Sequence, residues 1–189
     1  MRSASPGSEP PRAFQTALTD LRDLKPRAEI ELLEAPAPQR LAPYAIALTA
    51  DVIDVDDEEL ANGRLVLLHD PAGQETWEGF WRVVIFAKAT LEPEMAADPV
   101  LSEVGWSWLE EALNGAGAQV TAYGGTVTRT HSQPFGAMAG RDVSGDLEVR
   151  ASWTPLDDSM APNAVAWLDL LATMAGLAPL VDGVSTLRR

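Results

Sequence analysis

Residues 80–91 read FWRVVIFAKATL, and this stretch decides the fold. Valine, isoleucine, phenylalanine and tryptophan dominate it, and these side chains favour strands. The stretch is long enough to run through the middle of a sheet, and Pro93 and Pro99 follow it and end it. We therefore expect residues 80–91 to form a central strand.

Further elements are predicted on both sides of this strand from apolar spacing and from turn residues. Helical spacing marks Pro11–Leu24, Ser102–Leu113 and Pro162–Gly176, and strand patterns mark Ala28–Glu34, Tyr44–Val55, Arg64–His69, Gln119–Arg129 and Leu147–Trp153. Asn62-Gly63 and Asp70-Pro71-Ala72-Gly73 are predicted turns. The second of these would close a hairpin with the central strand, and Gly124-Gly125 would form a kink or bulge.

Most of the strand connections are too short for a crossover helix, which disfavours parallel pairing. We therefore predict a single α+β domain with an antiparallel sheet and helices packed mainly on one face. The expected order is helix, about four strands, helix, two strands, helix. Residues 11–180 would form the domain, with flexible tails at 1–10 and 181–189.

Charge and composition restrict the partners. The chain has 28 acidic and 14 basic side chains in 189 residues, a net charge of -14, and no basic cluster. Such a chain is repelled by phosphate backbones and by anionic membrane surfaces. No stretch approaches the length of a membrane span, and residues 1–11 (MRSASPGSEPP) lack the apolar core of a secretory signal.

Cysteine is absent, which excludes disulfides, thiol nucleophiles and cysteine-ligated metals. We expect a cytoplasmic protein that binds neither nucleic acid nor membranes.

One candidate for catalysis is the segment with His69 and Asp70, near Glu75 and Glu78. A histidine beside carboxylates can act as a general acid or base, so a small hydrolase-like or metal-assisted enzyme is the alternative function. Turn geometry explains the same Asp-Pro-Ala-Gly sequence without catalysis, and we favour that explanation.

The acidic segment from Asp51 to Glu59 concentrates carboxylates, but no register supplies both the glycine and the bidentate glutamate of a calcium loop. We interpret it as a solvated turn. The sequence also lacks a phosphate loop and a dinucleotide fingerprint, so we predict neither a metal nor a cofactor.

Six tryptophans are the residues that carry most weight for binding. The apolar arcs of the second and third predicted helices are wider than one sheet face would cover. We predict an apolar surface formed by Trp106, Trp108, Trp167 and Leu171, through which the chain would bind a protein partner or a second copy as a homodimer.

Several motifs agree, in order, with one known family. They are RLAPYA at 40–45, LLHDPAGQE at 67–75, LEPEM at 91–95, EVGWSWL at 103–109 and ASWTPL at 151–156. From about Phe14 to about Leu177 the chain resembles an uncharacterised actinobacterial family, the domain of unknown function numbered three thousand. The family has no assigned activity, so the resemblance implies no catalytic residue. It implies a cytoplasmic protein whose gene often lies beside that of a ribonuclease D-like protein with a helicase-and-RNase-D C-terminal domain, which is therefore a candidate partner. The sequence favours an acidic protein-binding or regulatory module over the enzyme.

Overall fold

The structure is a computed structural model that describes residues 9–179. In chain order its elements are α1 (Arg12–Arg22), β1 (Ile30–Ala35), β2 (Tyr44–Ile53), β3 (Glu59–Gln74), the short 3-10 helix η1 (Glu75–Trp77), β4 (Gly79–Leu91), α2 (Pro93–Ala97), α3 (Leu101–Gly115), β5 (Val120–Ser132), η2 (Gly136–Met138), β6 (Ser144–Pro155) and α4 (Ala161–Met174). Of the two predicted tails, residues 1–8 and 181–189 lie outside the described residues.

The strands pair into one antiparallel sheet with the order β1-β2-β3-β4-β6-β5. The predicted central strand is confirmed, because β4 pairs with β3 on one side and with β6 on the other. The α+β class and the antiparallel pairing are confirmed as well. One detail of the order differs: Pro93 begins the short helix α2, because proline is tolerated in the first turn of a helix.

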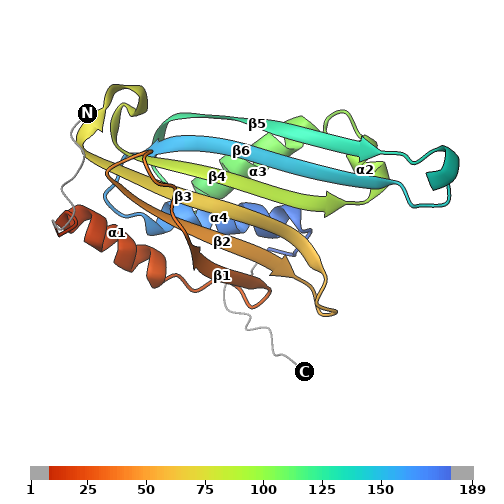
Figure 1. The fold of residues 1–189 in the computed structure, drawn as a ribbon, viewed down its shortest axis with the longest axis horizontal. Helices are drawn as coiled ribbons and strands as arrows, with labels where there is room; N and C mark the ends of the chain where they lie inside the picture. Colours follow the sequence, from red (N-terminus) through yellow and green to blue (C-terminus); the bar gives the residue numbers. More distant parts are fainter. Residues whose placement is uncertain (1–8, 180–189) are drawn as a thin grey trace.

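The helices lie mainly on one face of this sheet, with α3 and α4 behind it in Figure 1. Burial alternates along β4, where Val83, Ile85 and Ala87 are buried while Val84 and Thr90 are exposed. Successive strand residues point to opposite faces, so the helix-covered face holds the core. The opposite face, which we call the open face, is left to solvent.

Helix α4 lies at the centre of the covered face, where it contacts α1, α3 and the strands β2, β3 and β4. Trp167 and Leu171 of α4 are fully buried there. Trp153 of β6 is also fully buried, and its Nε1 donates a hydrogen bond of 2.8 Å to Oδ1 of Asn163. Because α4 is enclosed on several sides, its wide apolar arc belongs to the core.

The turn predicted at Asn62-Gly63 is wrong, since both residues lie inside β3. Gly63 is there because space is short: an added Cβ would lie 2.9 Å from Nε1 of Trp167. The chain reverses earlier, where Oδ1 of Asp54 accepts hydrogen bonds from the backbone N–H of Asp56 (2.8 Å) and Glu58 (3.0 Å). The side chain of Asp54 therefore stabilises the turn between β2 and β3, a role that the sequence pattern had assigned to Asn62-Gly63.

The hairpin predicted between residues 64–69 and the central strand is confirmed, but its turn lies further along the chain. Strand β3 continues through an irregular stretch between His69 and Gln74, and the reversal occurs at η1. Asp70 still organises the local backbone, because its Oδ1 accepts a hydrogen bond of 3.0 Å from the N–H of Ala72. The predicted bulge near Gly124 is confirmed by a register shift between Thr121 and Gly124.

Candidate functional site

A row of cross-strand neighbours crosses the open face of the sheet at its middle. Arg64 of β3 is in register with Phe86 of β4, which is in register with Arg150 of β6. The next row along the strands joins Val66, Val84 and Ser152 in the same manner. Register therefore places two arginines on either side of a phenylalanine, beside two valines.

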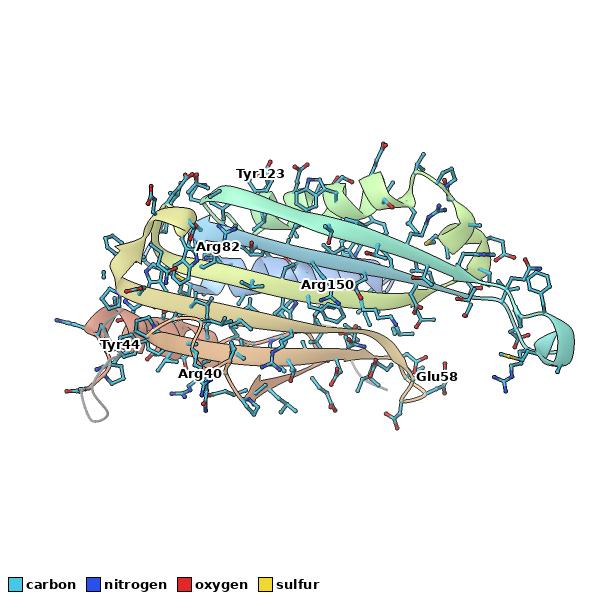
Figure 2. All side chains as sticks on the ribbon, turned by 45° about the horizontal axis from the view of Figure 1, so that its top comes forward. Arg40, Tyr44, Glu58, Arg82, Tyr123 and Arg150 are labelled. Carbon is cyan, nitrogen blue, oxygen red and sulfur yellow. The ribbon has the colours of Figure 1, made fainter. Side chains whose placement is uncertain are left out.

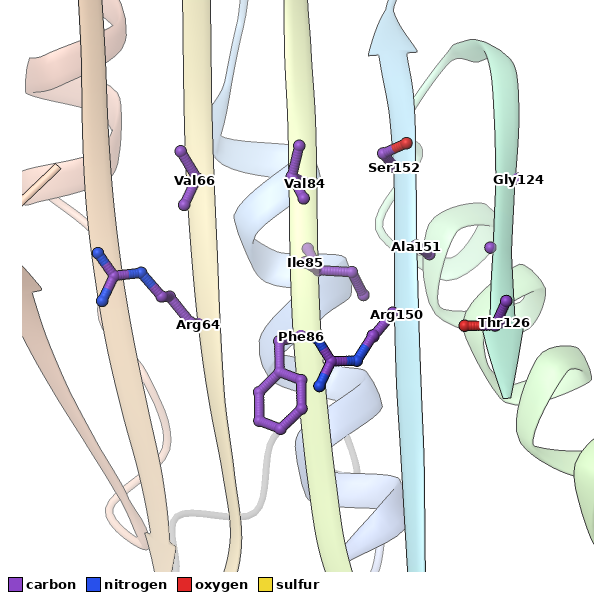
Figure 3. A pocket seen from close by; sticks show the side chains of 11 residues that line it. Arg64, Val66, Val84, Ile85, Phe86, Gly124, Thr126, Arg150, Ala151 and Ser152 are labelled. Carbon is purple, nitrogen blue, oxygen red and sulfur yellow. The ribbon is translucent and has the colours of Figure 1, made fainter. Parts of the chain in front are cut away.

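These side chains line a shallow groove of about 350 Å³, shown in Figure 3. We call it the sheet hollow and define it by Arg64, Val66, Val84, Phe86, Arg150 and Ser152. Gly124 and Thr126 of the edge strand β5 border it on one side. Glycine at position 124 adds no side chain, so the hollow stays open toward the sheet edge.

Arg150 lies over the ring of Phe86, with its guanidinium carbon 5.0 Å from the ring centroid. That geometry is within the range of a cation–π contact. Its Nε also donates a hydrogen bond of 2.5 Å to Oε1 of Glu148. The guanidinium is thus held above the hollow while its side chain stays largely exposed.

Arg64 lies at the opposite side of the hollow and donates a hydrogen bond of 2.5 Å from Nη2 to the backbone oxygen of Pro36. Within residues 9–179, no carboxylate oxygen lies within 4.0 Å of its guanidinium nitrogens. A guanidinium bound to a neutral carbonyl keeps its full positive charge and several unused N–H donors. Arg64 can therefore receive a carboxylate from another molecule.

A third arginine lies on the same face, as Figure 2 shows for Arg82 and Arg150. Nη1 of Arg82 donates to the backbone oxygen of Ala122 (2.8 Å) and to Oγ1 of Thr154 (3.2 Å), and Nη2 donates to Oγ of Ser152 (2.7 Å). Burial lowers the pKa of Arg82, and Glu78 opposes that shift. These bonds tie the bulge of β5 to β6 and leave another cation near the hollow.

His69 is placed in the covered layer, where 4% of its surface is exposed. Its ring stacks on Trp81 at 3.9 Å between centroids, and Phe14 and Tyr44 lie 6.1 and 6.2 Å away. Its Nδ1 is 3.1 Å from the backbone oxygen of Phe80. Burial lowers the pKa of His69, while that contact and Asp70 oppose the shift.

The other members of the predicted catalytic group have different surroundings. Asp70 is engaged by Ala72 and by Nε2 of Gln74, whereas Glu75 and Glu78 lie on the η1 reversal. Neither the sheet hollow nor the smaller hollow beside α3 is lined by any of these four residues. Among residues 9–179, no three histidines, aspartates or glutamates are grouped so that they could hold a metal ion.

The four residues of the predicted binding surface are divided between core and surface. Trp167 and Leu171 are fully buried, because α1, α3 and the sheet enclose α4. Trp106 and Trp108 of α3 are half-buried against the core. Trp106 stacks on Tyr123 with 6.1 Å between ring centroids, and its Nε1 donates a hydrogen bond of 3.1 Å to Oε1 of Glu110.

Trp106 also lines the smaller hollow, together with Ser102, Glu103, Gly125 and Val127. Gly125 lines the sheet hollow too, so the two hollows approach each other at the edge strand β5.

The patterns in the sequence did not predict the sheet hollow. The alternation of strand residues placed Arg64 with Val66 on one face of β3, and Val84 with Phe86 on one face of β4. The sequence alone does not give the register that brings β3, β4 and β6 together, since α2, α3, β5 and η2 separate β4 from β6 along the chain.

The fold and the hollow define an α+β protein with an antiparallel sheet that helices cover mainly on one face. The model of the family described as "Protein of unknown function (DUF3000)" matches residues 10–185, and the chain belongs to that family. No curated protein and no solved structure matches the chain. Within the described part of the chain, no helix is long and apolar enough to cross a membrane.

Proposed function

We propose that this protein is a cytoplasmic protein-binding module with a regulatory role, and that its docking surface is the open face of the sheet. The observation that carries the proposal is the sheet hollow, in which Arg64 and Arg150 border an apolar floor that includes the aromatic ring of Phe86. Arginine and aromatic residues supply much of the binding energy at protein interfaces, and they do so around well-packed pockets.

The charge distribution supports a local contact of this kind. The whole chain has a net charge of -14, yet Arg64, Arg82 and Arg150 lie together on the open face. At physiological ionic strength, charges more than about 8 Å apart are largely screened, so the nearest side chains dominate a contact. Arg150 is already paired with Glu148, whereas Arg64 has no carboxylate within 4.0 Å among residues 9–179. Arg64 is therefore the cation that favours a partner presenting a carboxylate beside an apolar group.

The ribonuclease D-like protein implied by the family resemblance is the first partner to test. The two purified proteins would be mixed and binding measured by isothermal titration calorimetry. In parallel, the tagged chain would be recovered from a cell of its own kind, and whatever survives a salt wash would be identified by mass spectrometry.

The variant that decides the surface is Val84→Arg, which fills the hollow while keeping a residue that fits an exposed strand position. Its matched control is Thr90→Arg, on the same strand and the same face but outside the hollow. We expect Val84→Arg to weaken binding of the recovered partner at least about tenfold, as for a well-placed interface residue, and Thr90→Arg to leave it intact. Equal binding by both variants would contradict the open-face proposal.

The half-buried aromatic residues of α3 offer a second surface for the same function. Replacing Trp106 and Trp108 by alanine would test it, and Trp106 adjoins the sheet hollow through Gly125. Loss of the partner in this variant, with Val84→Arg unaffected, would place the docking surface on α3.

A further inference from the structure

The loop that joins β2 to β3, together with the first residue of β3, forms a projecting acidic tip, which we define as residues 54–59. Five of its six residues are acidic, and the sixth, Val55, has 97% of its surface exposed. The hydrogen bonds that Asp54 accepts from Asp56 and Glu58 hold this turn in one shape. Figure 2 shows Glu58 at the far end of the β2–β3 hairpin, well away from Arg150.

The acidic tip and the sheet hollow are complementary in chemistry. The tip presents one valine side chain among carboxylates, and the hollow presents a floor of Val66, Val84 and Phe86. Arg150 lies over Phe86, and the guanidinium of Arg64 is turned outward over β2 (Figure 3). Valine fits an apolar floor, and arginine binds carboxylates with paired hydrogen bonds. From this match we infer that the acidic tip of one copy of the chain docks in the sheet hollow of a second copy.

The tip cannot reach the hollow of its own chain. Arg64 follows Glu59 by five residues on the same strand, so the two lie about 17 Å apart along β3. Strand β3 is paired on both sides there, by β2 and β4, and cannot fold back. A two-fold axis between two open faces would satisfy both hollows at once, because each copy supplies one tip and one hollow.

This inference rests on the proposed function, since it assigns an occupant to the same docking surface. A homodimer of this kind would cover the hollow, so a foreign partner would have to displace the second copy before binding. Self-association would then regulate access to the open face.

The test is a charge swap in the full-length chain. The tip variant is Asp56→Lys with Asp57→Lys and Glu58→Lys, which changes the charge of residues 54–59 from −5 to +1, and the hollow variant is Arg64→Glu with Arg150→Glu. Each should lose dimerisation alone, because like charges would meet at both contacts. Mixed in equal amounts they should dimerise again. One contact of the mixed dimer then pairs a native tip with a native hollow, and the other pairs a reversed tip with a reversed hollow.

Dimerisation is measured by sedimentation velocity between about 1 µM and 1 mM, a range that spans weak and moderate affinities. We expect a wild-type dimer, a loss of at least about tenfold in affinity for each variant, and recovery of the dimer in the mixture. The control is Arg12→Glu with Arg141→Glu, which changes the net charge as the hollow variant does, at exposed positions outside tip and hollow. It should dimerise like the wild type.

Three results would overturn the inference: a monomeric wild type over the whole range, variants that dimerise as well as the wild type, or a mixture that stays monomeric although both variants show a folded circular dichroism spectrum. If the hollow variant does not fold, Arg64→Gln alone replaces it, and an unchanged dimer affinity would contradict the docking. The two proposals can fail separately. If the wild type is monomeric but Val84→Arg still abolishes binding of the foreign partner, docking between two copies is refuted and the proposed function is supported.

Discussion

Replacing Gly63 by alanine tests how closely α4 is seated against the sheet. The added Cβ would lie 2.7 Å from the backbone oxygen of Phe86, 2.9 Å from Nε1 of Trp167 and 3.0 Å from Cδ1 of Leu171. Real Cβ atoms do not approach other atoms so closely, so the indole has to move. The hydrogen bond of 3.2 Å from Nε1 of Trp167 to the oxygen of Phe86 would be lost with it.

The size of the effect follows from three contributions. Overpacking a core costs about 1–3 kcal/mol, and losing one hydrogen bond costs about 1 kcal/mol. Removing a glycine from the unfolded chain returns about 0.4–1 kcal/mol. We therefore expect Gly63→Ala to lower the free energy of unfolding by about 2 kcal/mol.

Urea unfolding followed by circular dichroism measures this difference. Gly124→Ala is the matched control, since no atom lies within 4 Å of its added Cβ and its φ is not positive. It should leave stability unchanged or raise it by up to about 1 kcal/mol. In a Trp167→Phe background, Gly63→Ala should cost at least about 0.5 kcal/mol less, because one of the clashing atoms has gone. Equal costs in both backgrounds, or a Gly63→Ala protein as stable as Gly124→Ala, would refute the reasoning.

Two further predictions concern the covered layer. Burial lowers the pKa of His69, so below about pH 6.5 the unfolded chain gains a proton that the folded chain lacks. Stability should therefore fall as the pH falls through that value, and above it stability should not depend on this group. The variant His69→Phe should reduce the difference in unfolding free energy between pH 7.5 and 5.5. An unchanged difference would argue against a buried neutral imidazole. Trp153→Phe removes the donor to Oδ1 of Asn163 and should cost about 1–3 kcal/mol in urea unfolding. In a double-mutant cycle with Asn163→Ala, additive costs would show that the bond contributes nothing.

The elements of the sheet could be predicted because each strand carries its own pattern. Strand β4 alternates buried and exposed residues over most of its length, and β-branched side chains mark it locally. The antiparallel arrangement also followed from the sequence, because short connections leave no room for a crossover.

The turns and the sheet hollow could not be predicted in the same way, because they depend on contacts between distant segments. Gly63 had the sequence of a turn, but it is a strand residue that makes room for Trp167, about a hundred positions later. The wide apolar arc of α4 had the pattern of a partner surface, and α1, α3 and the sheet cover it. A sequence pattern shows which side chains avoid water but does not show which neighbour covers them.

The sheet hollow likewise depends on contacts between strands that are distant in the sequence. Its arginines are ordinary exposed residues when each strand is considered alone, and only the register of β3, β4 and β6 aligns Arg64, Phe86 and Arg150. The predicted catalytic group fails to gather for a related reason. His69 turns into the aromatic stack, whereas Asp70 serves the backbone beside it.

In a sheet that helices cover on one face only, odd- and even-numbered positions of a strand tolerate different substitutions, because they face opposite sides of the sheet. In a saturation scan of β4, odd-numbered positions such as Val83, Ile85 and Ala87 should register in a selection for abundance, because they form the core. Even-numbered positions such as Val84 and Phe86 should register most strongly in a selection for binding. Under the proposed docking function, binding specificity can diverge between lineages through the even-numbered positions of β4, while the odd-numbered positions keep the fold unchanged.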